Sequence, residues 1–360
     1  MNAWTALADG ASGRCPRIPA LAVTGSGRVI CVWDDRPDWR DLPGDIGLVQ
    51  SHSDDHGRTW SPPVPLRSAT PARGCGDASL IWHEPSGRLL CFYTASTGQN
   101  FFSSVPGGAG LENWLAVSRD DGATWHHREL TDDLRASTVG GLFASSGNGC
   151  ALSDGRLLQP FVLRDGRGNH HAAMACSDDG GQTWRLGEWI GPDCDENKVA
   201  QCPDGSLLLH ARATPRRRWA RSHDGGRTFT PPTPHPALTD PACNGGLVQW
   251  QGRMVCSLLD DEEQRRRLVL RLSDDQGESW GGAILLDEGA AGYSVLVALA
   301  DGGLGIAYEQ GDYEAICFRR VEPAELGLDG TPVSLVARPG GGVATPPLVA
   351  PARHEQGTEA

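Results

Sequence analysis

The sequence predicts an all-β fold, a six-bladed β-propeller, and three observations lead to it. An eight-residue motif, Ser-x-Asp-x-Gly-x-Thr/Ser-Trp/Phe, occurs five times, beginning at Ser53, Ser118, Ser177, Ser222 and Ser273. Successive copies lie 65, 59, 45 and 51 residues apart, which suits one four-stranded blade per copy. Short apolar runs bounded by Gly-containing turns separate the copies, and no long stretch has helical periodicity.

Each copy of the motif, called an Asp box below, has the composition of a tight hairpin. The Asp side chain can accept hydrogen bonds from backbone N–H groups of its own turn. Gly supplies a backbone conformation that other residues resist, and the Thr or Ser hydroxyl can close the turn. The last residue, Trp in four copies and Phe229 in the fourth, begins the next strand and can pack between neighbouring sheets.

Apolar runs between the boxes predict strands at 28–33, 89–93, 157–162, 206–211 and 303–308. The last unit, 300–319, has no Asp box after it, so we expect a sixth blade that a strand from near the N-terminus closes. Residues 1–336 are therefore predicted to form the propeller. Residues 337–360 are rich in Gly, Pro and Ala and are predicted to be a flexible C-terminal tail.

Composition excludes several classes of partner. The formal charge of −13 argues against binding to nucleic acid, although a local cluster of arginines can still bind a small anion. No apolar run is long enough to span a membrane. The eleven cysteines include no C-x-x-C pair, which predicts reduced thiols. No signal peptide is visible, which predicts a cytoplasmic protein, or a secreted one if a leader was removed. Nothing indicates an oligomeric state.

The functional signal lies in charged or aromatic segments outside the Asp boxes. These segments are 15–21, 34–41, 195–212, 265–267 and 292–309. Two adjacent histidine pairs, at 126–127 and 170–171, have no third ligand at metal spacing, and neighbouring side chains on a strand point apart. We therefore predict no catalytic metal and no cofactor.

In these segments the sequence resembles the sialidase (neuraminidase) family of exo-α-sialidases, from about residue 17 to residue 319. The Arg-Ile-Pro run at 17–19 together with the Asp boxes is the signature of that family, and the other segments follow in the family's order. Three positions depart from the pattern: Pro16 stands where the family usually has an aromatic residue, Ala78 where it often has Pro, and Phe229 ends the fourth box. None of these changes removes a catalytic group.

The resemblance implies three arginines that bind the carboxylate of the sugar. Arg17 is similar to the first, Arg212 to the second and Arg265 to the third. Arg267 is the alternative for the third position, since it lies on the same strand face by period two. Glu309 resembles the carboxylate that orients the first arginine.

The resemblance also implies the catalytic groups. Asp41 resembles the acid/base, Tyr293 the nucleophile, and Glu196 the base that activates it. Arg36 and Asp77 resemble the pair that contacts the 4-hydroxyl of the sugar. Elementary chemistry agrees with these roles, because guanidinium groups bind a carboxylate bidentately. A carboxylate substrate repels an Asp or Glu nucleophile, whereas a phenol is neutral until a base takes its proton.

The resemblance therefore predicts hydrolysis of terminal sialic acid from sialylated glycans, with retention after two displacements. Phe101, Phe102 and Phe143 are candidates for the pocket that receives the N-acetyl group, so a related nonulosonic acid remains open as the substrate. A trans-sialidase is the first alternative, although no acceptor site is evident. The second is a non-catalytic propeller that binds glycans or proteins, since Asp boxes also occur in binding modules.

Overall fold

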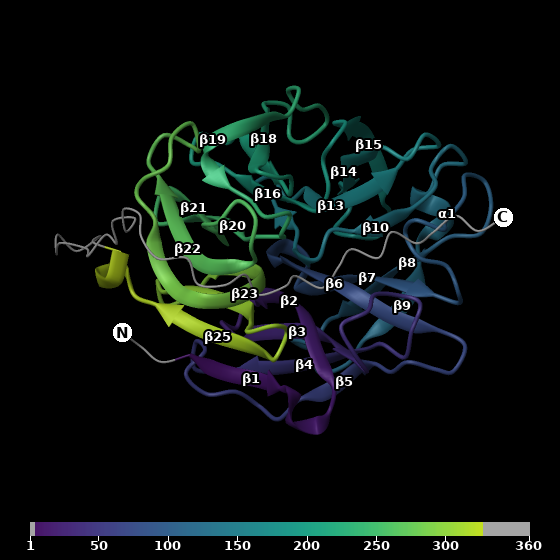
Figure 1. Ribbon diagram of the computed structural model, residues 1–360, viewed down its shortest axis with the longest axis horizontal. Helices are drawn as coiled ribbons and strands as arrows, with labels where there is room; N and C mark the ends of the chain where they lie inside the picture. Colours follow the sequence, from purple (N-terminus) through teal and green to yellow (C-terminus); the bar gives the residue numbers. More distant parts are fainter. Residues whose placement is uncertain (1–3, 327–360) are drawn as a thin grey trace.

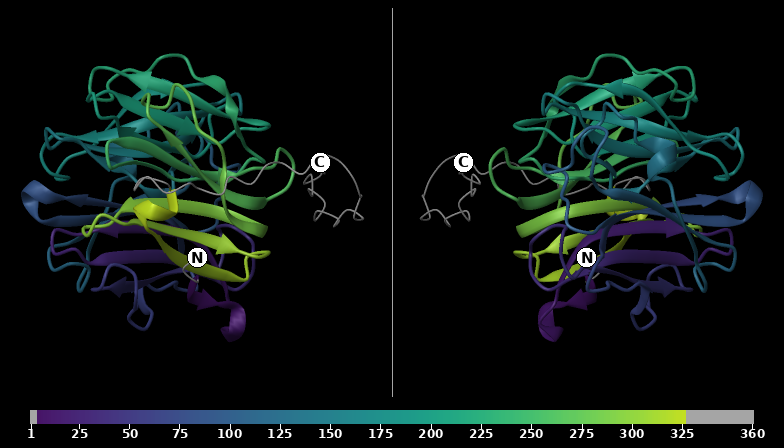
Figure 2. Two further views of the ribbon diagram at one scale, coloured as in Figure 1. Left: turned by 90° about the vertical axis from the view of Figure 1, so that its left-hand side faces the viewer. Right: turned by 90° about the vertical axis from the view of Figure 1, so that its right-hand side faces the viewer.

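The computed structural model describes residues 4–326, and apart from short helical turns its regular structure is β-strand. The strands form sheets arranged around a central axis (Figure 1), which appear as successive layers when the molecule is viewed from the side (Figure 2). This arrangement confirms the all-β, propeller-like prediction. The predicted tail at 337–360 lies outside the described residues.

The first three sheets are mainly antiparallel and largely follow the chain order, except that the short strand at 147–148 joins the second sheet. The first contains β2 (Cys15–Val23), β3 (Val29–Arg36), β4 (Gly47–Ser53) and β5 (Val64–Arg67). The second contains β6 (Gly74–His83), β7 (Arg88–Ser96), β8 (Glu112–Ser118), β9 (His126–Glu129) and, parallel to β6, β11 (Gly147–Asn148). The third contains β10 (Leu142–Ala144), β12 (Cys150–Ala151), β13 (Leu157–Arg164), β14 (His170–Ser177) and β15 (Arg185–Ile190).

The remaining strands form one sheet of four and one of seven. The fourth sheet contains β16 (Asn197–Gln201), β17 (Leu207–Ala211), β18 (Arg216–Ser222) and β19 (Thr233–Thr239). The seven-stranded sheet contains β20 (Leu247–Trp250), β21 (Arg253–Leu259), β22 (Arg266–Ser273), β23 (Ile284–Ala298), β24 (Leu304–Gln310), β25 (Ala315–Val321) and β1 (Thr5–Asp9). The helical turns are α1 (Thr131–Leu134) and the 3-10 turns Gly10–Ser12, Glu84–Ser86 and Pro323–Leu326.

The long strand β23 explains why the described residues form five sheets rather than the predicted six separate ones. The first part of β23 pairs with β22, for example Leu285 with Val269, and the second part pairs with β24, for example Val295 with Ala307. One continuous strand therefore joins two groups of strands that the sequence treated as separate blades. The predicted closure by an N-terminal strand is confirmed, because β1 pairs antiparallel with β25.

The Asp boxes connect the third strand of each unit to the fourth, and they share one pattern of hydrogen bonds. In the first box, Ser53 Oγ accepts from Gly57 N at 2.8 Å and donates to Asp55 Oδ1 at 2.8 Å. Asp55 accepts from the backbone N–H of Thr59 at 2.8 Å and from its hydroxyl at 2.6 Å. The other four boxes repeat these contacts. The turn is therefore built by local contacts, as predicted.

Box residues also pack against the preceding sheet. The Trp60 ring lies 4.9 Å from the Phe318 ring in β25, and the Trp184 ring lies 4.8 Å from the Phe92 ring in β7. Gly57 has a φ of 87°, and a Cβ there would lie 2.2 Å from the Phe318 ring. Only glycine fits both the turn and this close approach. The boxes therefore link adjacent sheets as well as adjacent strands.

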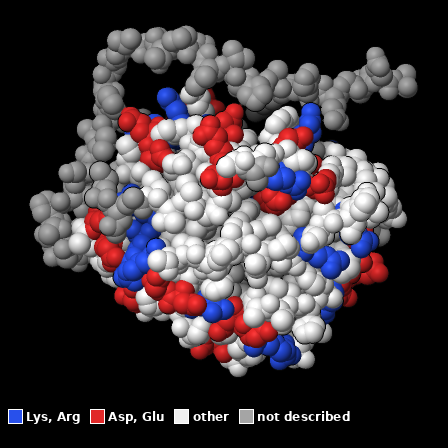
Figure 3. Space-filling view, turned by 90° about the horizontal axis from the view of Figure 1, so that it is seen from below, with Lys and Arg blue, Asp and Glu red and all other residues white. Residues whose placement is uncertain are grey.

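The surface and the cysteines agree with the composition. No helix among residues 4–326 is long and apolar enough to cross a membrane. All eleven cysteines lie in the described part of the chain and are free thiols. On the described part of the face in Figure 3, acidic and basic side chains are interspersed around a broad area that carries neither. That face therefore has no continuous basic surface of the kind that nucleic acids need.

Candidate active site

The predicted site residues lie at the opposite ends of the strands from the Asp boxes. The boxes follow third strands, whereas Arg36 ends the second strand β3 and Arg212 directly follows the second strand β17. Glu196 directly precedes the first strand β16. Because neighbouring strands are antiparallel, these positions meet at one end of the central axis. The fold therefore gathers residues that are distant in sequence.

Glu309, at the end of β24, is a buried carboxylate that holds two of the predicted residues. Its Oε1 accepts from Arg17 Nε at 3.1 Å and from Ile18 N at 2.8 Å, and its Oε2 accepts from Tyr293 N at 2.9 Å. A Cβ at Gly292 would lie 2.0 Å from Glu309 Oε2, so this position requires glycine. Charge pairing and three hydrogen bonds offset the cost of burying the carboxylate, and they fix Arg17 relative to Tyr293.

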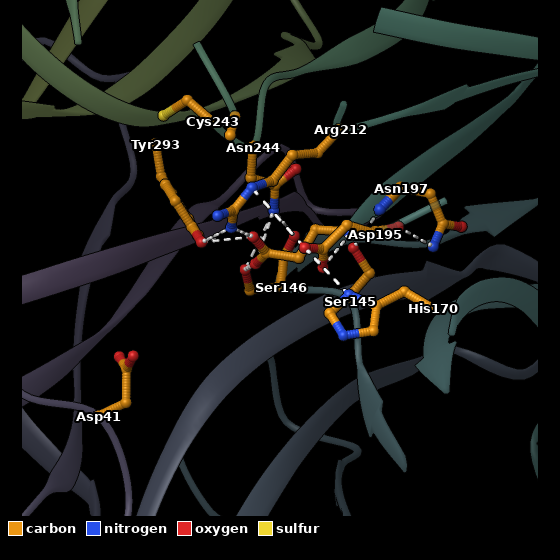
Figure 4. A network of polar contacts seen from close by, with 12 residues as sticks. Asp41, Ser145, Ser146, His170, Asp195, Asn197, Arg212, Cys243, Asn244 and Tyr293 are labelled. Carbon is orange, nitrogen blue, oxygen red and sulfur yellow. Dashed lines mark hydrogen bonds and ion pairs between the residues drawn. The ribbon is translucent and has the colours of Figure 1, made fainter. Parts of the chain in front are cut away.

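Tyr293 and Arg212 lie together in the polar network of Figure 4, and Glu196 hydrogen-bonds to both. The Tyr293 hydroxyl donates to Glu196 Oε2 in a short hydrogen bond. Arg212 Nη1 lies 2.6 Å from Glu196 Oε2 and 2.8 Å from the Tyr293 hydroxyl. Burial raises the pKa of Tyr293 well above its ordinary value, and Arg212 opposes this only in part. The phenol is therefore protonated at rest, with Glu196 in position to accept its proton.

The structure separates the two candidates for the third arginine. Arg265 lies with its guanidinium carbon 5.5 Å from the centre of the Tyr293 ring, and its Nη2 donates to Ala242 O at 2.7 Å. Arg267 instead lies 3.6 Å from the carboxylate of Glu288. Arg265 thus belongs to the cluster around Tyr293, and Arg267 does not. The sequence favoured Arg265 and kept Arg267 as the alternative on the same strand face, but Arg265 lies in a bend just before β22.

Tyr313 belongs to the same cluster, and sequence reasoning missed it. The guanidinium carbon of Arg17 lies 4.0 Å from the centre of the Tyr313 ring, and Arg265 Nη1 donates to the Tyr313 hydroxyl at 3.1 Å. Tyr313 lies in the turn between β24 and β25 with a φ of 61°, a strained conformation for a tyrosine. The one feature of the sequence that could have pointed to Tyr313 is the rarity of tyrosine, since the chain has only four.

Arg36 is a buried guanidinium that binds two carboxylates, those of Asp34 and Asp41. Its Nε and Nη2 donate to Asp34 Oδ2 at 3.1 and 2.6 Å, and its Nη1 donates to Asp41 Oδ1 at 2.6 Å. Asp34 also accepts from Asp77 N at 3.1 Å. Burial raises the pKa of Asp34 to about 6, although Arg36 opposes the shift. Burial and then the charge of Asp34 raise the pKa of Asp77. Sequence reasoning had left Asp34 unassigned.

Asp41 differs from the other carboxylates because its side chain is 79% exposed. Figure 4 shows it apart from Tyr293, with no contact to the other residues drawn. Desolvation alone would raise the pKa of Asp41, but the charges of Arg36 and Arg17 outweigh this effect and lower the pKa below its ordinary value. Arg17 Nη1 lies 3.8 Å from Asp41 Oδ1. The carboxylate is therefore ionised in the ligand-free site.

Two further side chains contact Glu196 at Oε1, the oxygen that does not face Tyr293, and neither was assigned from sequence. Ser146 Oγ donates to Glu196 Oε1 at 3.3 Å, and Asn244 Nδ2 lies 3.4 Å from the same oxygen. Asp195 Oδ1 accepts from Glu196 N at 2.8 Å. Glu196 is thus held through both oxygens and its backbone. No sequence pattern marks Ser146 or Asn244, because they reach Glu196 only through the circular arrangement of the sheets.

The three phenylalanines proposed to line a pocket form one aromatic cluster with His170. The ring of Phe101 lies 5.1 Å from that of Phe143 and 5.2 Å from that of His170, and Phe102 is 70% exposed. His170 Nδ1 lies 3.7 Å from Asp195 Oδ2, which is 3.9 Å from Arg212 Nε. The cluster is therefore linked to the arginine site through His170. Among residues 4–326, no group of three or more His, Cys, Asp or Glu could hold a metal ion.

The chain is similar to a family model and to several known proteins. The family model described as BNR repeat-like domain matches residues 27–306. A sialidase of Micromonospora viridifaciens is 34% identical over 321 residues, which cover 82% of this chain and 50% of that protein. A sialidase of Bacteroides fragilis (strain YCH46) is 28% identical over 323 residues, which cover 81% and 59%. The chain therefore spans about half to three fifths of the length of these relatives.

Solved structures show the same fold. The Hadza microbial sialidase Hz136 superposes with a TM-score of 0.82 at 27% identity, covering 89% of this chain and 68% of that one. A leech intramolecular trans-sialidase superposes with a TM-score of 0.81 at 15% identity, covering 91% and 71%, and shows the fold alone. Since the family model matches most of the chain, and the sialidase relatives match it over the same region, the chain belongs to the BNR-repeat sialidase family.

Proposed function

We propose that this protein is an exo-α-sialidase, a glycoside hydrolase that releases terminal sialic acid, or a related nonulosonic acid, from sialylated glycans. The observation that carries the proposal is the Tyr293–Glu196 hydrogen bond beside the guanidinium groups of Arg17, Arg212 and Arg265. A phenol next to a base supplies a nucleophile, and a cluster of arginines supplies a site for the substrate carboxylate. A glycan-binding module needs the second feature but not the first.

The arginines would seat the carboxylate next to the anomeric carbon. Their guanidinium carbons lie 5.7, 6.0 and 5.5 Å from the centre of the Tyr293 ring for Arg17, Arg212 and Arg265. Substrate held there would present its anomeric carbon to the Tyr293 hydroxyl. Arg36 and Asp77 would contact the 4-hydroxyl, since both hydrogen-bond to Asp34 and so lie side by side.

In the first displacement, the Tyr293 oxygen would attack the anomeric carbon while its proton passes to Glu196. Asp41 would donate a proton to the leaving oxygen, which requires the protonated form of a group that is ionised in the free site. A substrate carboxylate provides the cause, because it neutralises part of the charge of Arg17 and so raises the pKa of Asp41. In the second displacement, water would attack the anomeric carbon while Asp41 takes its proton, and the bond to the Tyr293 oxygen would break as Glu196 returns the proton to that oxygen, with overall retention.

Incubation with a fluorogenic α-sialoside tests the proposal, with the wild-type protein beside Tyr293→Phe and Asp41→Ala. We expect release of the fluorophore by the wild type and little or none by Tyr293→Phe. NMR of the first-formed sugar should show the α anomer. An inactive wild type would refute the enzyme assignment, and an inverted first product would refute the tyrosine mechanism.

The same experiment separates hydrolysis from transfer. A leech enzyme of the same fold is an intramolecular trans-sialidase whose structure holds 2,7-anhydro-Neu5Ac. Detection of free sialic acid supports hydrolysis, whereas an anhydro sugar or a new sialoside formed with an added acceptor would assign the chain as a trans-sialidase.

We also propose that the seven-stranded sheet counts as two blades, which makes six in total. Two observations support this count. The two parts of β23 pair with different neighbours, and the register shifts between Ala291 and Ser294 where the partner changes. An experimental structure that kept β23 straight and paired along its whole length with one neighbour would refute it.

A further inference from the structure

Lys198 is the only lysine among the 32 lysine and arginine residues of the chain. It lies in β16, two residues after Glu196, and its side chain is buried, with 1% of the residue exposed. Arginine stays charged in proteins, whereas a buried lysine can lose its proton. The chain thus uses its one titratable side-chain amine at a buried position next to the proposed base.

The Lys198 ammonium contacts neutral oxygens. Nζ donates to Ser146 O at 2.5 Å and to Asn244 Oδ1 at 2.9 Å. Among the described residues it forms no ion pair within 4.0 Å. A Cβ at Gly147 would lie 3.0 Å from Lys198 Cε, so the lysine stem is closely packed. Burying a cation that contacts only neutral groups costs free energy. The presence of a lysine at this position therefore needs an explanation.

The groups that bind Lys198 are the groups that hold Glu196. Because Asn244 Oδ1 accepts from Lys198, the amide of Asn244 must present Nδ2 on its other side. That Nδ2 lies 3.4 Å from Glu196 Oε1 and 3.1 Å from Ser146 Oγ, which itself donates to Glu196 Oε1 at 3.3 Å. With Oε1 occupied, Glu196 Oε2 is left facing Tyr293 and Arg212.

The charges of Lys198 and Glu196 are also coupled. Burial lowers the pKa of Lys198 to about 7, the charge of Glu196 opposes this shift, and Arg217 adds to it. Among the described residues, these two are the charged groups whose charges act on the pKa of the ammonium. When Glu196 accepts the Tyr293 proton it loses its negative charge, so the ammonium then loses the one charge that favours it.

We propose that Lys198 is the positioning residue of the Glu196–Tyr293 pair: its ammonium orients the Asn244 amide and the Ser146 carbonyl, and through them holds Glu196 with Oε2 toward the tyrosine. The inference rests on the proposed function for its kinetic consequence. Its structural consequence is independent of catalysis, because the proton on Lys198 must respond to the charge of Glu196.

The first experiment measures that proton directly. In protein labelled with ¹³Cε-lysine and carrying no added lysine, Lys198 gives the one side-chain signal, which can be followed over pH. We expect its midpoint near 7 in the wild type, and a lower midpoint in Glu196→Gln, which removes the charge but keeps the size. A midpoint near about 10.4, the ordinary lysine value, that does not move in Glu196→Gln would overturn the inference.

The second experiment measures the kinetic consequence with Lys198→Met, which keeps the length of the side chain and removes its charge. We expect kcat on an α-sialoside to fall by roughly ten- to a hundredfold, with a smaller change in KM and a shifted pH profile. The matched control is Arg88→Met, because Arg88 also donates to a backbone carbonyl, Gly180 O at 2.9 Å, but lies outside the site. We expect Arg88→Met to retain wild-type kinetics.

The outcomes distinguish the two proposals. A wild type without sialidase activity refutes the proposed function, and the NMR midpoints still decide the role of Lys198. An active wild type with unchanged kcat and pH profile in folded Lys198→Met refutes the positioning role. If Lys198→Met fails to fold, the response of the lysine signal to Glu196→Gln decides the question alone.

Discussion

The Asp boxes and the arginine–tyrosine cluster occupy opposite ends of the strands and use carboxylates in opposite ways. In the second Asp box, the hydrogen bonds from Thr124 lower the pKa of Asp120 to about 2. In the cluster, burial raises the pKa of Asp34 to about 6. The box carboxylate is exposed to water and its partners lie within four residues. The cluster carboxylate of Asp34 is buried, and besides the neighbouring Arg36 it accepts from the backbone N–H of Asp77, a residue on another sheet.

The difference shows that residues at one end of the strands stabilise the fold, while residues at the other end form the candidate active site. The contacts within the Asp boxes repeat in every copy and depend on local turn geometry. Each box therefore makes a small contribution to the stability of the packing between two adjacent sheets. Site contacts occur once and span long separations, such as the 292 residues between Arg17 and Glu309. Substitutions at the two ends should therefore have different consequences, either on rate or on stability.

The largest effect is expected for Tyr293→Phe. Loss of the nucleophilic oxygen should lower kcat by roughly a thousandfold or more, or about 4 kcal/mol of barrier, while the aromatic ring keeps its packing. Tyr308→Phe is the matched control, because it also loses a buried hydroxyl, which here donates to Asp287. Steady-state assays and thermal melts of both variants check the prediction, and comparable kcat losses in the two would contradict it.

Arginine replacements at 265 and 267 should differ in their effect on the substrate. Arg265→Ala should lower kcat/KM by roughly a hundredfold, or about 3 kcal/mol, because Arg265 lies 5.5 Å from the centre of the Tyr293 ring. Arg267→Ala should stay near the wild-type value, since its partner is the exposed Glu288. Equal losses in kcat/KM would show that the ring distance does not identify the third arginine.

At the other end of the strands, Gly57→Ala should destabilise the fold and leave kcat per folded molecule unchanged. The new Cβ would lie 2.2 Å from the Phe318 ring at a φ of 87°, which should cost about 2 kcal/mol of unfolding free energy. Gly205→Ala is the control, because its φ is 86° but a Cβ there meets nothing within 4 Å. Urea unfolding of both variants separates the clash from the backbone strain, and equal losses would contradict the proposed contact.

The smallest effect concerns acid stability. Burial raises the pKa of Asp55, but hydrogen bonds from Thr59 and Ser53 outweigh it and lower the pKa to about 2. A lowered carboxyl pKa stabilises the fold above the ordinary value of 3.8, and this contribution is lost as the pH falls through about 2. Asp55→Asn should lower the free energy of unfolding by about 1 kcal/mol at neutral pH. As the pH falls, the stability of this variant should decline less than that of the wild type.

Thermal melts between pH 5 and pH 2 (roughly the range in which a shifted carboxyl titrates) measure this decline. Asp54→Asn is the control, because Asp54 pairs with Arg28 at the surface and such pairs contribute little. If Asp54→Asn and Asp55→Asn have the same acid profile, the box hydrogen bonds do not carry the stabilisation.

The sequence by itself determined the parts of this protein that depend on neighbouring residues. Strand positions follow from apolar runs between turns, and the Asp boxes follow from eight consecutive residues whose hydrogen bonds close within the motif. The segments that carry the site could also be located, through their order and their resemblance to a family. Each of these patterns can be recognised in the amino-acid sequence because its cause is local or repeated.

Only the tertiary structure decided which side chains meet. It separated Arg265 from Arg267, joined two groups of strands through β23, and brought Tyr313 to the arginines. It also placed Lys198 behind Glu196 through Asn244, which is 46 residues from Lys198 in sequence. The physical reason is that burial and long-range contacts set the charge state and orientation of these groups, and neither exists until the sheets close around their axis.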